Sequence, residues 1–567
     1  MVSLKLSAWL CMAACISIVS PVPIRHEKRQ ADAVPRVELG YETHLGTFNN
    51  VGNYYMFNNI PYAEQPVAGL RFDEPVAIRG TNNRTNNGTS YDIICPQAFP
   101  QWVIDSLAAQ KGVDSETMAT VLRTIPGQNE GCLYLDVYVP PEVFHQGESA
   151  KVPVLVWVHG GGFTFGSKNM YGDPAGLISR SRQYGEPGII VVSINYRLGL
   201  FGWLGGDILG NLGLLDQKKA LVWVQQHIGR FGGDATRVTL MGESAGAAGI
   251  VHHITAFKRE KDEYPLFHGA ILLSPAWQFN HDVVASYVKT AATASDVLGI
   301  DVKDRDDLFK VAFESLNTIN QAIVGSAPMG TFGYGPAPDG VYVQDHPQVA
   351  LHYGHMDPRL KLLISHTSNE SIPFIPPPSA LATDDDVREY VSRTLPQAPA
   401  AALGELLTSD RLYPDAAHAS PDAAYPWTTP YGRAARLASD LSFACTTRYL
   451  ARAAGNGSYN YLFAYPPGWH AGDVPYVFYN GNDDDNDDNN GFPVVDAALA
   501  HELQDYIVAF ARTGNPNGAY TTDVEFPVYG AEARILELTE DGFREGVDDL
   551  KGDRCDWIQS ALIDGRL

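Results

Sequence analysis

The chain has 567 residues, of which 45% are apolar, and it carries a net charge of −24 with a pI near 5.0. This length and apolar content are sufficient for a large hydrophobic core. The negative charge repels phosphate backbones and anionic lipid surfaces, so the composition argues against nucleic-acid binding and is typical of a soluble surface.

The N-terminal segment 1–20, MVSLKLSAWLCMAACISIVS, predicts a signal peptide, because one lysine precedes an apolar run too short to span a bilayer. The dibasic pair Lys28-Arg29 would suit removal of a pro-segment before Gln30, and a basic patch in a flexible leader explains it equally well. No later apolar stretch of membrane-spanning length and no hydrophobic tail follow. We therefore expect a secreted protein without a membrane anchor, with residues 30–567 forming a single domain.

Cysteine usage agrees with export. Once Cys11 and Cys15 leave with the signal peptide, an even number of cysteines remains, without close metal-binding spacing. These are Cys95, Cys132, Cys445 and Cys555. We expect disulfides and neither a zinc site nor another cofactor.

Three glycosylation sequons lie in polar stretches that predict surface loops, at Asn83, Asn87 and Asn456. A low-complexity insert, NGNDDDNDDNNG at 480–491, is rich in aspartate and holds no apolar residue. Such a segment cannot pack, so it predicts a solvated loop. Weak calcium binding is the alternative, but the glycine and terminal glutamate spacing of a calcium loop is missing.

From residue 150 onward, apolar runs alternate with helical patterns. KVPVLVWVHG, GIIVVSINY, RVTLMG and FHGAILLSPAW predict strands, as do the later RLKLLISHT and SYNYLFAY. LLDQKKALVWVQQHIGRF and SAGAAGIVHHITAF predict helices. This alternation is typical of an α/β fold with a large, mostly parallel sheet covered by helices on both faces. Short β-like runs within segment 1–75 predict a small N-terminal antiparallel sheet.

The tetrapeptide GESA occurs twice, around Ser149 and around Ser244. Ser149 lies in a polar connection ahead of a predicted strand. Ser244 follows a strand and precedes a helix within GESAG, the G-x-S-x-G elbow that lifts a nucleophilic serine off a sheet. Glycine in the last place lets neighbouring backbone approach, which Lys151 could not do. Ser244 is therefore the candidate nucleophile.

A second motif supports this assignment. The strand VPVLVWV ends in His159-Gly160-Gly161-Gly162-Phe163, which matches the HGGG-type oxyanion loop of lipases and esterases. Backbone N–H groups placed where the tetrahedral oxyanion forms lower the barrier by several kcal/mol.

The nucleophile needs a base and an acid, which in this architecture follow in the order serine, acid, histidine. Of His418, His470 and His501, only His470 sits in a Gly/Pro-bounded loop after a predicted strand, so we predict it as the base. On spacing alone the acid is either Glu370, directly after the strand RLKLLISHT, or Asp339 in PAPDGV.

Several segments resemble the type-B carboxylesterase/lipase family, the α/β-hydrolases that include cholinesterases and secreted fungal lipases. They are FNNIPYAEQPVAGLRF, EGCLYLDV, NYRLGLFGWL, GNLGLLDQKKALVWVQQHIGRFGGD, VTLMGESAGA, HTSNES, WHAGDVPYVF and FARTGNPNG. The match covers about residues 40–560. The chain departs from the family pattern at Gly131, where aspartate is usual, and at Ser371, where glycine is usual.

The resemblance implies an α/β-hydrolase fold and a carboxylic ester hydrolase with Ser244 as nucleophile, His470 as base and Glu370 as acid. It implies an oxyanion hole formed by the N–H groups of Gly161, Gly162 and Ala245, and no cofactor. It also implies two disulfides, Cys95–Cys132 and Cys445–Cys555, whereas a third family disulfide has no cysteines here. A sequon at Asn369 abuts the acid, where a glycan would block the site.

Three alternatives stay open at this stage. A triacylglycerol lipase would use residues 96–131 as a lid, and this segment includes the amphipathic stretch FPQWVIDSLAAQ with Trp102. A specialised esterase would act on one fungal metabolite. A cholinesterase-like adhesion or binding protein would keep the fold without the chemistry. The partner is a small ester in the first two cases, and the sequence says nothing about oligomeric state.

Overall fold

The computed structural model describes residues 34–81, 85–88, 92–206, 210–256, 265–278, 283–415, 427–481, 494–518 and 524–567. The predicted signal peptide, the Lys28-Arg29 site, Asn83 and His418 lie outside these residues, as does the acidic insert from residue 482 onward.

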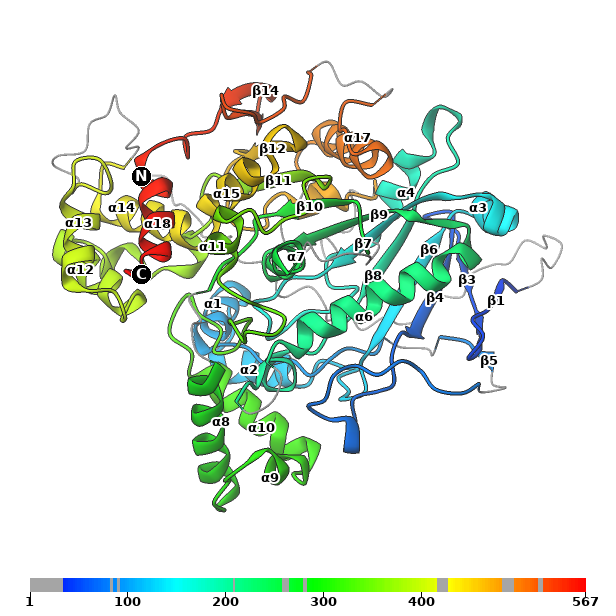
Figure 1. The fold of residues 1–567 in the computed structure, drawn as a ribbon, viewed down its shortest axis with the longest axis horizontal. Coiled ribbons are helices and arrows are strands. Elements are labelled where there is room, and N and C mark those ends of the chain that lie inside the picture. The colour runs from blue at the N-terminus through cyan, green and yellow to red at the C-terminus, as the bar shows by residue number, and fades with distance from the viewer. Residues whose placement is uncertain are drawn as a thin grey trace.

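A central sheet of eleven strands runs through the molecule (Figure 1). In spatial order its strands are β14 (Gly542–Val547), β13 (Arg534–Thr539), β12 (Ser458–Phe463), β11 (Lys361–Thr367), β10 (Gly269–Leu273), β9 (Gly233–Glu243), β7 (Val152–Val158), β8 (Ile190–Ile194), β6 (Tyr134–Val139), β4 (Tyr54–Pro61) and β3 (Thr47–Asn49). The middle, from β13 to β8, is parallel throughout, and the pairs at both edges are antiparallel. The predicted large, mostly parallel sheet is confirmed, and all six predicted strands belong to it.

The small N-terminal sheet differs in one respect from the prediction. Its strands are β1 (Arg36–Glu38), β2 (Thr43–Leu45) and β5 (Thr85–Asn86). The pair β1–β2 is antiparallel, but β2–β5 is parallel, because the long connection 46–84 brings the chain back to run in the same direction. The other early strands, β3 and β4, extend the central sheet instead.

Helices cover both faces of the sheet, as predicted for its nearly continuous apolar strands. In chain order they are α1 (Gln101–Lys111), α2 (Ser115–Arg123), α3 (Pro141–Gln146), α4 (Ala175–Ser181), α5 (Gly199–Trp203), α6 (Leu212–His227), α7 (Ala245–Thr255), α8 (Val283–Leu298), α9 (Arg305–Phe309), α10 (Phe313–Gly325), α11 (Pro347–His352), α12 (Asp384–Thr394), α13 (Ala400–Thr408), α14 (Pro430–Ser439), α15 (Cys445–Ala454), α16 (Val474–Val477), α17 (Ala497–Thr513) and α18 (Asp553–Ile563). None of the helices in the described part of the chain has the length and apolar character that crossing a bilayer requires.

The hydrophobic core has two large parts, one on each face of the sheet. Helices α6, α7 and α15 contribute to one part, and α4, α16 and α17 to the other. A third, smaller cluster lies under the α1–α2 hairpin and is rich in phenylalanine. Figure 1 shows α8, α9 and α10 projecting from one end of the molecule and α12, α13 and α14 gathered beside α18 at another.

Candidate active site

Ser244 lies at the sharp junction between β9 and α7. Its backbone has φ 53° and ψ −120°, a conformation that non-glycine residues rarely adopt and that marks strained functional turns. The strain is held by hydrogen bonds on both sides, because the Ser244 N–H donates to the Leu273 carbonyl and the Ala276 N–H donates to the Ser244 carbonyl. Ser244 is buried, with 9% of its surface exposed.

The glycine after the nucleophile has a clear steric reason. A Cβ on Gly246 would lie 2.0 Å from the carbonyl oxygen of Val158, because α7 starts directly against the end of β7. The first GESA stretch has no such approach. Ser149 is on an exposed turn before β7, and its hydroxyl donates to the Gln146 carbonyl. The position predicted for each serine is therefore the position observed.

His470 and Glu370 meet across neighbouring strands. Glu370 follows β11 and His470 follows β12, and Nδ1 of His470 lies 2.5 Å from Oε2 of Glu370. The Glu370 carboxylate is fully buried, and its other oxygen accepts hydrogen bonds from the Ser274 hydroxyl and the Thr367 N–H. Burial raises the pKa of Glu370, but His470 and these donors outweigh it and hold the pKa below its usual value.

The opposite nitrogen of His470 faces the elbow. Nε2 of His470 lies 3.1 Å from Oε1 of Glu243, the buried residue directly before Ser244. Burial lowers the pKa of His470, but the negative charges and hydrogen bonds of Glu370 and Glu243 outweigh it and raise the pKa to about 10. The imidazole is therefore held between two carboxylates, one on each ring nitrogen.

The competing candidates take other roles in the structure. Oδ1 of Asp339 accepts the N–H groups of residues 341–343, and Oδ2 accepts from the Asn211 amide, so this carboxylate closes a turn. His501 lies within α17 and packs against Tyr479. Of the two acids considered, only Glu370 contacts His470.

The glycine loop after β7 is packed tightly. Gly161 and Gly162 have φ of 104° and 59°, in the region that favours glycine. A Cβ on Gly161 would lie 2.1 Å from the Phe165 carbonyl oxygen, and a Cβ on Gly162 would lie 2.2 Å from the ring of Phe332. Ala245, the first residue of α7, is buried beside Ser244. Close packing therefore restricts the backbone conformation at each of the three predicted oxyanion positions.

An aromatic wall covers the histidine. The rings of Phe374 and Phe443 have centroids 5.1 Å and 4.6 Å from that of His470, and both side chains are buried. Phe443 is carried by a five-residue π-helix, Asp440–Ala444, inserted between α14 and α15. Such insertions are rare and concentrate at functional sites.

The wall continues into the α1–α2 hairpin. Trp102 of α1 packs edge-on against Phe332 and Phe374, and its indole N–H donates to the Thr331 carbonyl at 3.1 Å. The indole is half-buried and packs against the third hydrophobic cluster, two of whose members, Phe374 and Phe443, contact His470. The hairpin lies inside the segment closed by the first disulfide.

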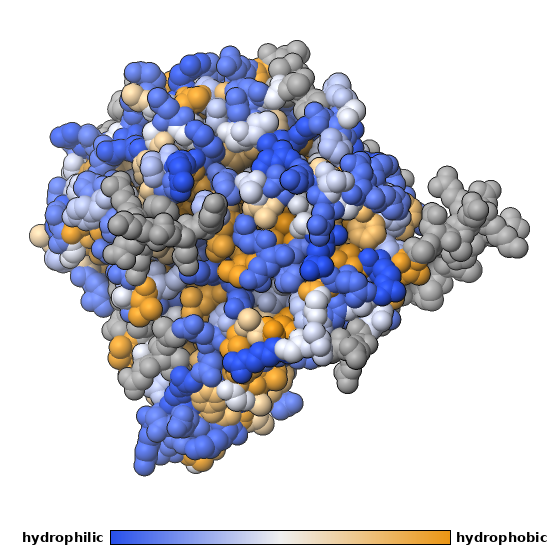
Figure 2. Space-filling view, turned by 45° about the vertical axis from the view of Figure 1, so that its right-hand side comes forward, coloured by the Kyte–Doolittle hydropathy of each residue, from blue (hydrophilic) through white to orange (hydrophobic). Residues whose placement is uncertain are grey.

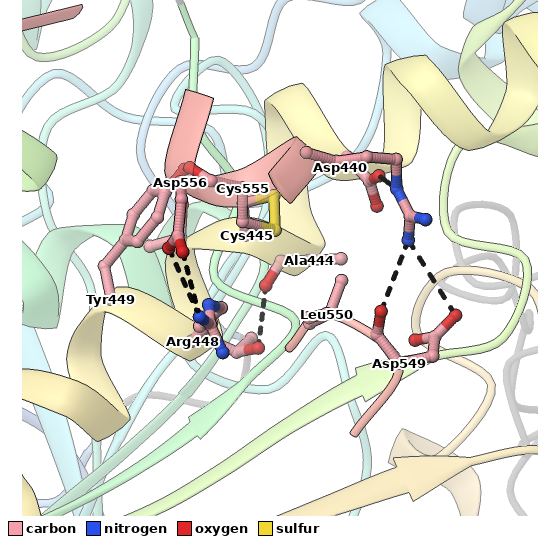
Figure 3. Close-up of a disulfide and its surroundings, with 12 residues drawn as sticks. Asp440, Ala444, Cys445, Arg448, Tyr449, Asp549, Leu550, Cys555 and Asp556 are labelled. Carbon is pink, nitrogen blue, oxygen red and sulfur yellow. Dashed lines mark hydrogen bonds and ion pairs between the residues drawn. A yellow bond between two sulfur atoms is a disulfide. The ribbon is translucent and has the colours of Figure 1, made fainter. Parts of the chain in front are cut away.

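Both disulfides implied by the family resemblance are present. Cys95–Cys132 closes a segment with a sequence separation of 37 residues, and Cys445–Cys555 spans 110 residues. Figure 3 shows the second bridge joining α15 to α18, with Arg448 of α15 directed at Asp556 of α18.

The described sequons lie on the surface. Asn87 and Asn456 are exposed, as expected for surface loops. Asn369 is also exposed, but its amide donates to the Pro467 carbonyl, and the Ser371 hydroxyl of the same sequon is buried and donates to Ala435.

Sequence reasoning missed four contacts of the site. Glu243 occupies the variable position of the G-x-S-x-G elbow, and Ser274 lies at the end of the predicted strand FHGAILLSPAW. Phe374 and Phe443 carry no local signal, because their place beside His470 depends on packing between segments far apart in the chain.

Comparison with known proteins agrees with this geometry. A sequence model described as the carboxylesterase family matches residues 38–556. Carboxylesterase patB of Aspergillus clavatus is 37% identical over 562 residues, covering 93% of this chain and 96% of that protein. Secreted lipase 1 of Botryotinia fuckeliana is 29% identical, covering 85% of each chain.

Solved structures share the fold. The crystal structure of Aspergillus niger EstA superposes with a TM-score of 0.75 at 24% identity, covering 94% of this chain and 99% of that one. A thermophilic PNB esterase superposes with a TM-score of 0.69 at 26% identity, covering 91% and 98%. Because the family model matches most of its length and a carboxylesterase shares more than a third of its residues, the chain belongs to the carboxylesterase family and is a carboxylic ester hydrolase.

Proposed function

We propose that Ser244, His470 and Glu370 form the catalytic triad and that the hydrolysis proceeds through an acyl-enzyme. Ser244 Oγ attacks the ester carbonyl while His470 takes its proton, and the protonated imidazole then delivers that proton to the departing alcohol. A water molecule then attacks the acyl-enzyme while His470 takes its proton, and the carboxylic acid is released as Ser244 regains a proton. The observation that carries this proposal is the buried His470–Glu370 contact, whose imidazole reaches Glu243, the residue before Ser244 in the strained elbow.

The same proposal assigns the N–H groups of Gly161, Gly162 and Ala245 to the oxyanion. Its support is the fixed backbone at these positions, where no side chain can be added without collision at the two glycines. Preorganised donors of this kind need no rearrangement when charge develops on the carbonyl oxygen.

The decisive experiment is the substitution Ser244→Ala. We expect hydrolysis of a short-chain nitrophenyl ester to fall by at least about 10³-fold, since the nucleophile is lost, and labelling by a fluorophosphonate probe to disappear. Ser149→Ala, the matched serine of the other GESA stretch, should leave both readouts unchanged. Labelling of Ser244→Ala, or no labelling of the parent, would contradict the mechanism.

We favour an esterase of soluble substrates over a triacylglycerol lipase. Ser244 and His470 are 9% and 8% exposed beneath an aromatic wall, which leaves little access for a long acyl chain while the α1–α2 hairpin is in this position. The similarity to carboxylesterase patB supports the same choice, and the similarity to secreted lipase 1 keeps the lipase as the second candidate. A rate that jumps when triglyceride passes its solubility limit would favour the lipase, and a smooth rate favours the esterase.

We further propose that the protein is secreted as one domain, residues 30–567, glycosylated at Asn83, Asn87 and Asn456. Two disulfides and the exposed sequons at Asn87 and Asn456 support this, since disulfides persist in oxidising compartments. A mass shift on deglycosylation of protein recovered from culture medium tests it.

A further inference from the structure

A histidine and two aspartates come together on the face of the sheet that packs against α15. His366 is on β11, and Asp548 and Asp549 follow β14 at the start of the segment that leads to α18. One ligand-capable atom from each residue lies within 4.8 Å of the other two. Figure 3 shows Asp549 beside Leu550 on that segment, below the Cys445–Cys555 bridge.

The histidine is unusual in its surroundings. His366 is 5% exposed, and its Nδ1 has no hydrogen-bond partner among the described residues. A buried imidazole nitrogen without a partner is unfavourable, because it has left water without compensation. The two carboxylates lie close to the ring without satisfying this nitrogen, so three potential ligand groups face a common point.

The two aspartates are oriented by hydrogen bonds and an ion pair with residues other than His366. Oδ2 of Asp548 accepts from the Tyr529 hydroxyl and Oδ1 from the Leu550 N–H, while Oδ2 of Asp549 is paired with Arg436 at 2.7 Å. Each oxygen of Asp548 keeps a lone pair for a further ligand, and Oδ1 of Asp549 is not the oxygen that forms the ion pair with Arg436. Outer contacts of this type orient metal ligands in known sites.

We propose that His366, Asp548 and Asp549 bind one divalent transition-metal ion of the Zn²⁺ type. Tetrahedral ligands about 2.0–2.2 Å from one ion lie about 3.3–3.6 Å from one another, so these atoms, which lie within 4.8 Å of one another, close in by up to about 1.5 Å when the ion binds. An imidazole with two carboxylates suits Zn²⁺, whereas Ca²⁺ prefers oxygen ligands alone. The site shares no residue with the proposed triad.

The side chains around the cluster carry an excess of negative charge, which favours the binding of one cation. Asp440, Asp548 and Asp549 carry three negative charges, and Arg436 and Arg554 carry two positive charges against Asp440 and Asp549. The cluster therefore keeps a net negative charge when His366 is neutral.

The test uses the full-length protein without a histidine tag, freed of metal with EDTA and titrated with Zn²⁺ by calorimetry. We expect one equivalent to bind and the thermal unfolding midpoint to rise. His366→Gln removes a direct ligand and should weaken binding by more than about 100-fold, beyond the loss typical of an outer contact, whereas His355→Gln, the matched change at an exposed histidine, should not. If His366→Gln fails to fold, Asp549→Asn at the exposed ligand carries the same test.

Three outcomes would overturn the proposal. One is the absence of specific Zn²⁺ binding, with His366→Gln changing only the pH dependence of stability, which would make imidazolium the native cation. Another is Zn²⁺ binding that survives both substitutions, which would place the ion elsewhere. The last is equal binding of Ca²⁺ that is insensitive to His366→Gln, which would indicate a site made of carboxylates alone.

Discussion

Glu243 distinguishes the proton chemistry of this site from that of a simple triad. A histidine beside one carboxylate is oriented and modestly stabilised as imidazolium, whereas His470 has a carboxylate on each side. Both neighbours are buried, so their charges act through a medium that screens them poorly. The imidazole must be neutral to accept a proton from Ser244, and the second carboxylate opposes that state.

This arrangement predicts the pH profile of the parent and of Glu243→Gln. A pKa of His470 raised to about 10 means that kcat/KM rises with pH through the neutral range, because the neutral imidazole becomes more abundant. Removing the Glu243 charge lowers that pKa, so the acidic limb should move down by about 1–3 pH units.

The matched control is Glu148→Gln, the exposed glutamate of the other GESA stretch. It should reproduce the parent profile in a kcat/KM series that runs from mildly acidic to alkaline pH. An unshifted acidic limb in Glu243→Gln would mean that Glu243 has no influence on the base.

At this scale the sequence predicts the site unevenly. Ser244 and the glycine loop are local motifs, so one sequence suffices to find them. The choice of Glu370 over Asp339 needed the family resemblance, because spacing alone left both open. Ser274, which holds Glu370 from the end of β10, lies 96 residues from it, and only the folded sheet brings the two together.

Among the elements, the α1–α2 hairpin is packed separately from the two large parts of the core. The buried residues of the hairpin belong to the third, phenylalanine-rich cluster and to neither large part of the core. Two members of this cluster, Phe374 and Phe443, contact His470. The amphipathic stretch of the sequence forms a helix here, and the Trp102 indole packs against the cluster.

Trp102→Ala should therefore loosen the hairpin selectively. Loss of the Thr331 hydrogen bond and of two aromatic contacts should speed amide exchange in residues 101–123 by at least about tenfold, which corresponds to roughly 1.4 kcal/mol. Trp102→Phe keeps a ring without the N–H and should fall between the two. Exchange measured by mass spectrometry that rises equally throughout the chain would contradict a local role.

The strands and helices of the central region were predictable because continuous apolar runs and helical spacing identify buried parallel strands and their covering helices. The parallel pairing of β2 with β5 was not, since such short strands carry too little pattern to fix direction. The π-helix that carries Phe443 was not predicted either, and Phe443 meets His470 only through packing between segments far apart in the chain.

At the scale of the whole molecule, the C-terminal helix α18 is held against a helix that lies far from it in the sequence. The Cys445–Cys555 bridge ties α18 to α15, while Arg554 of α18 binds Asp440 and Arg448 binds Asp556.

Most of the surface in Figure 2 is hydrophilic, with hydrophobic residues grouped near the centre of that view. The two faces of the sheet supply the bulk of the buried apolar side chains.

Loop length predicts which disulfide matters more for stability. Removing Cys445–Cys555 by paired alanine substitution should destabilise the fold by about 2–5 kcal/mol, and the longer loop should make this effect larger than that of removing Cys95–Cys132 by about 1 kcal/mol. Urea unfolding of both variants measures it. A larger loss from the Cys95–Cys132 pair would show that strain or packing, rather than chain entropy, decides the order.

The contact between Glu370 and His470 has a consequence for biosynthesis. The two residues follow adjacent parallel strands but are 100 positions apart, so they meet only after β12 has paired with β11. A nascent or truncated chain that ends before residue 470 can carry a finished serine elbow and still lack its base. Turnover of a fluorogenic ester by such a chain therefore reports that β12 has paired with β11 and brought the base to its acid.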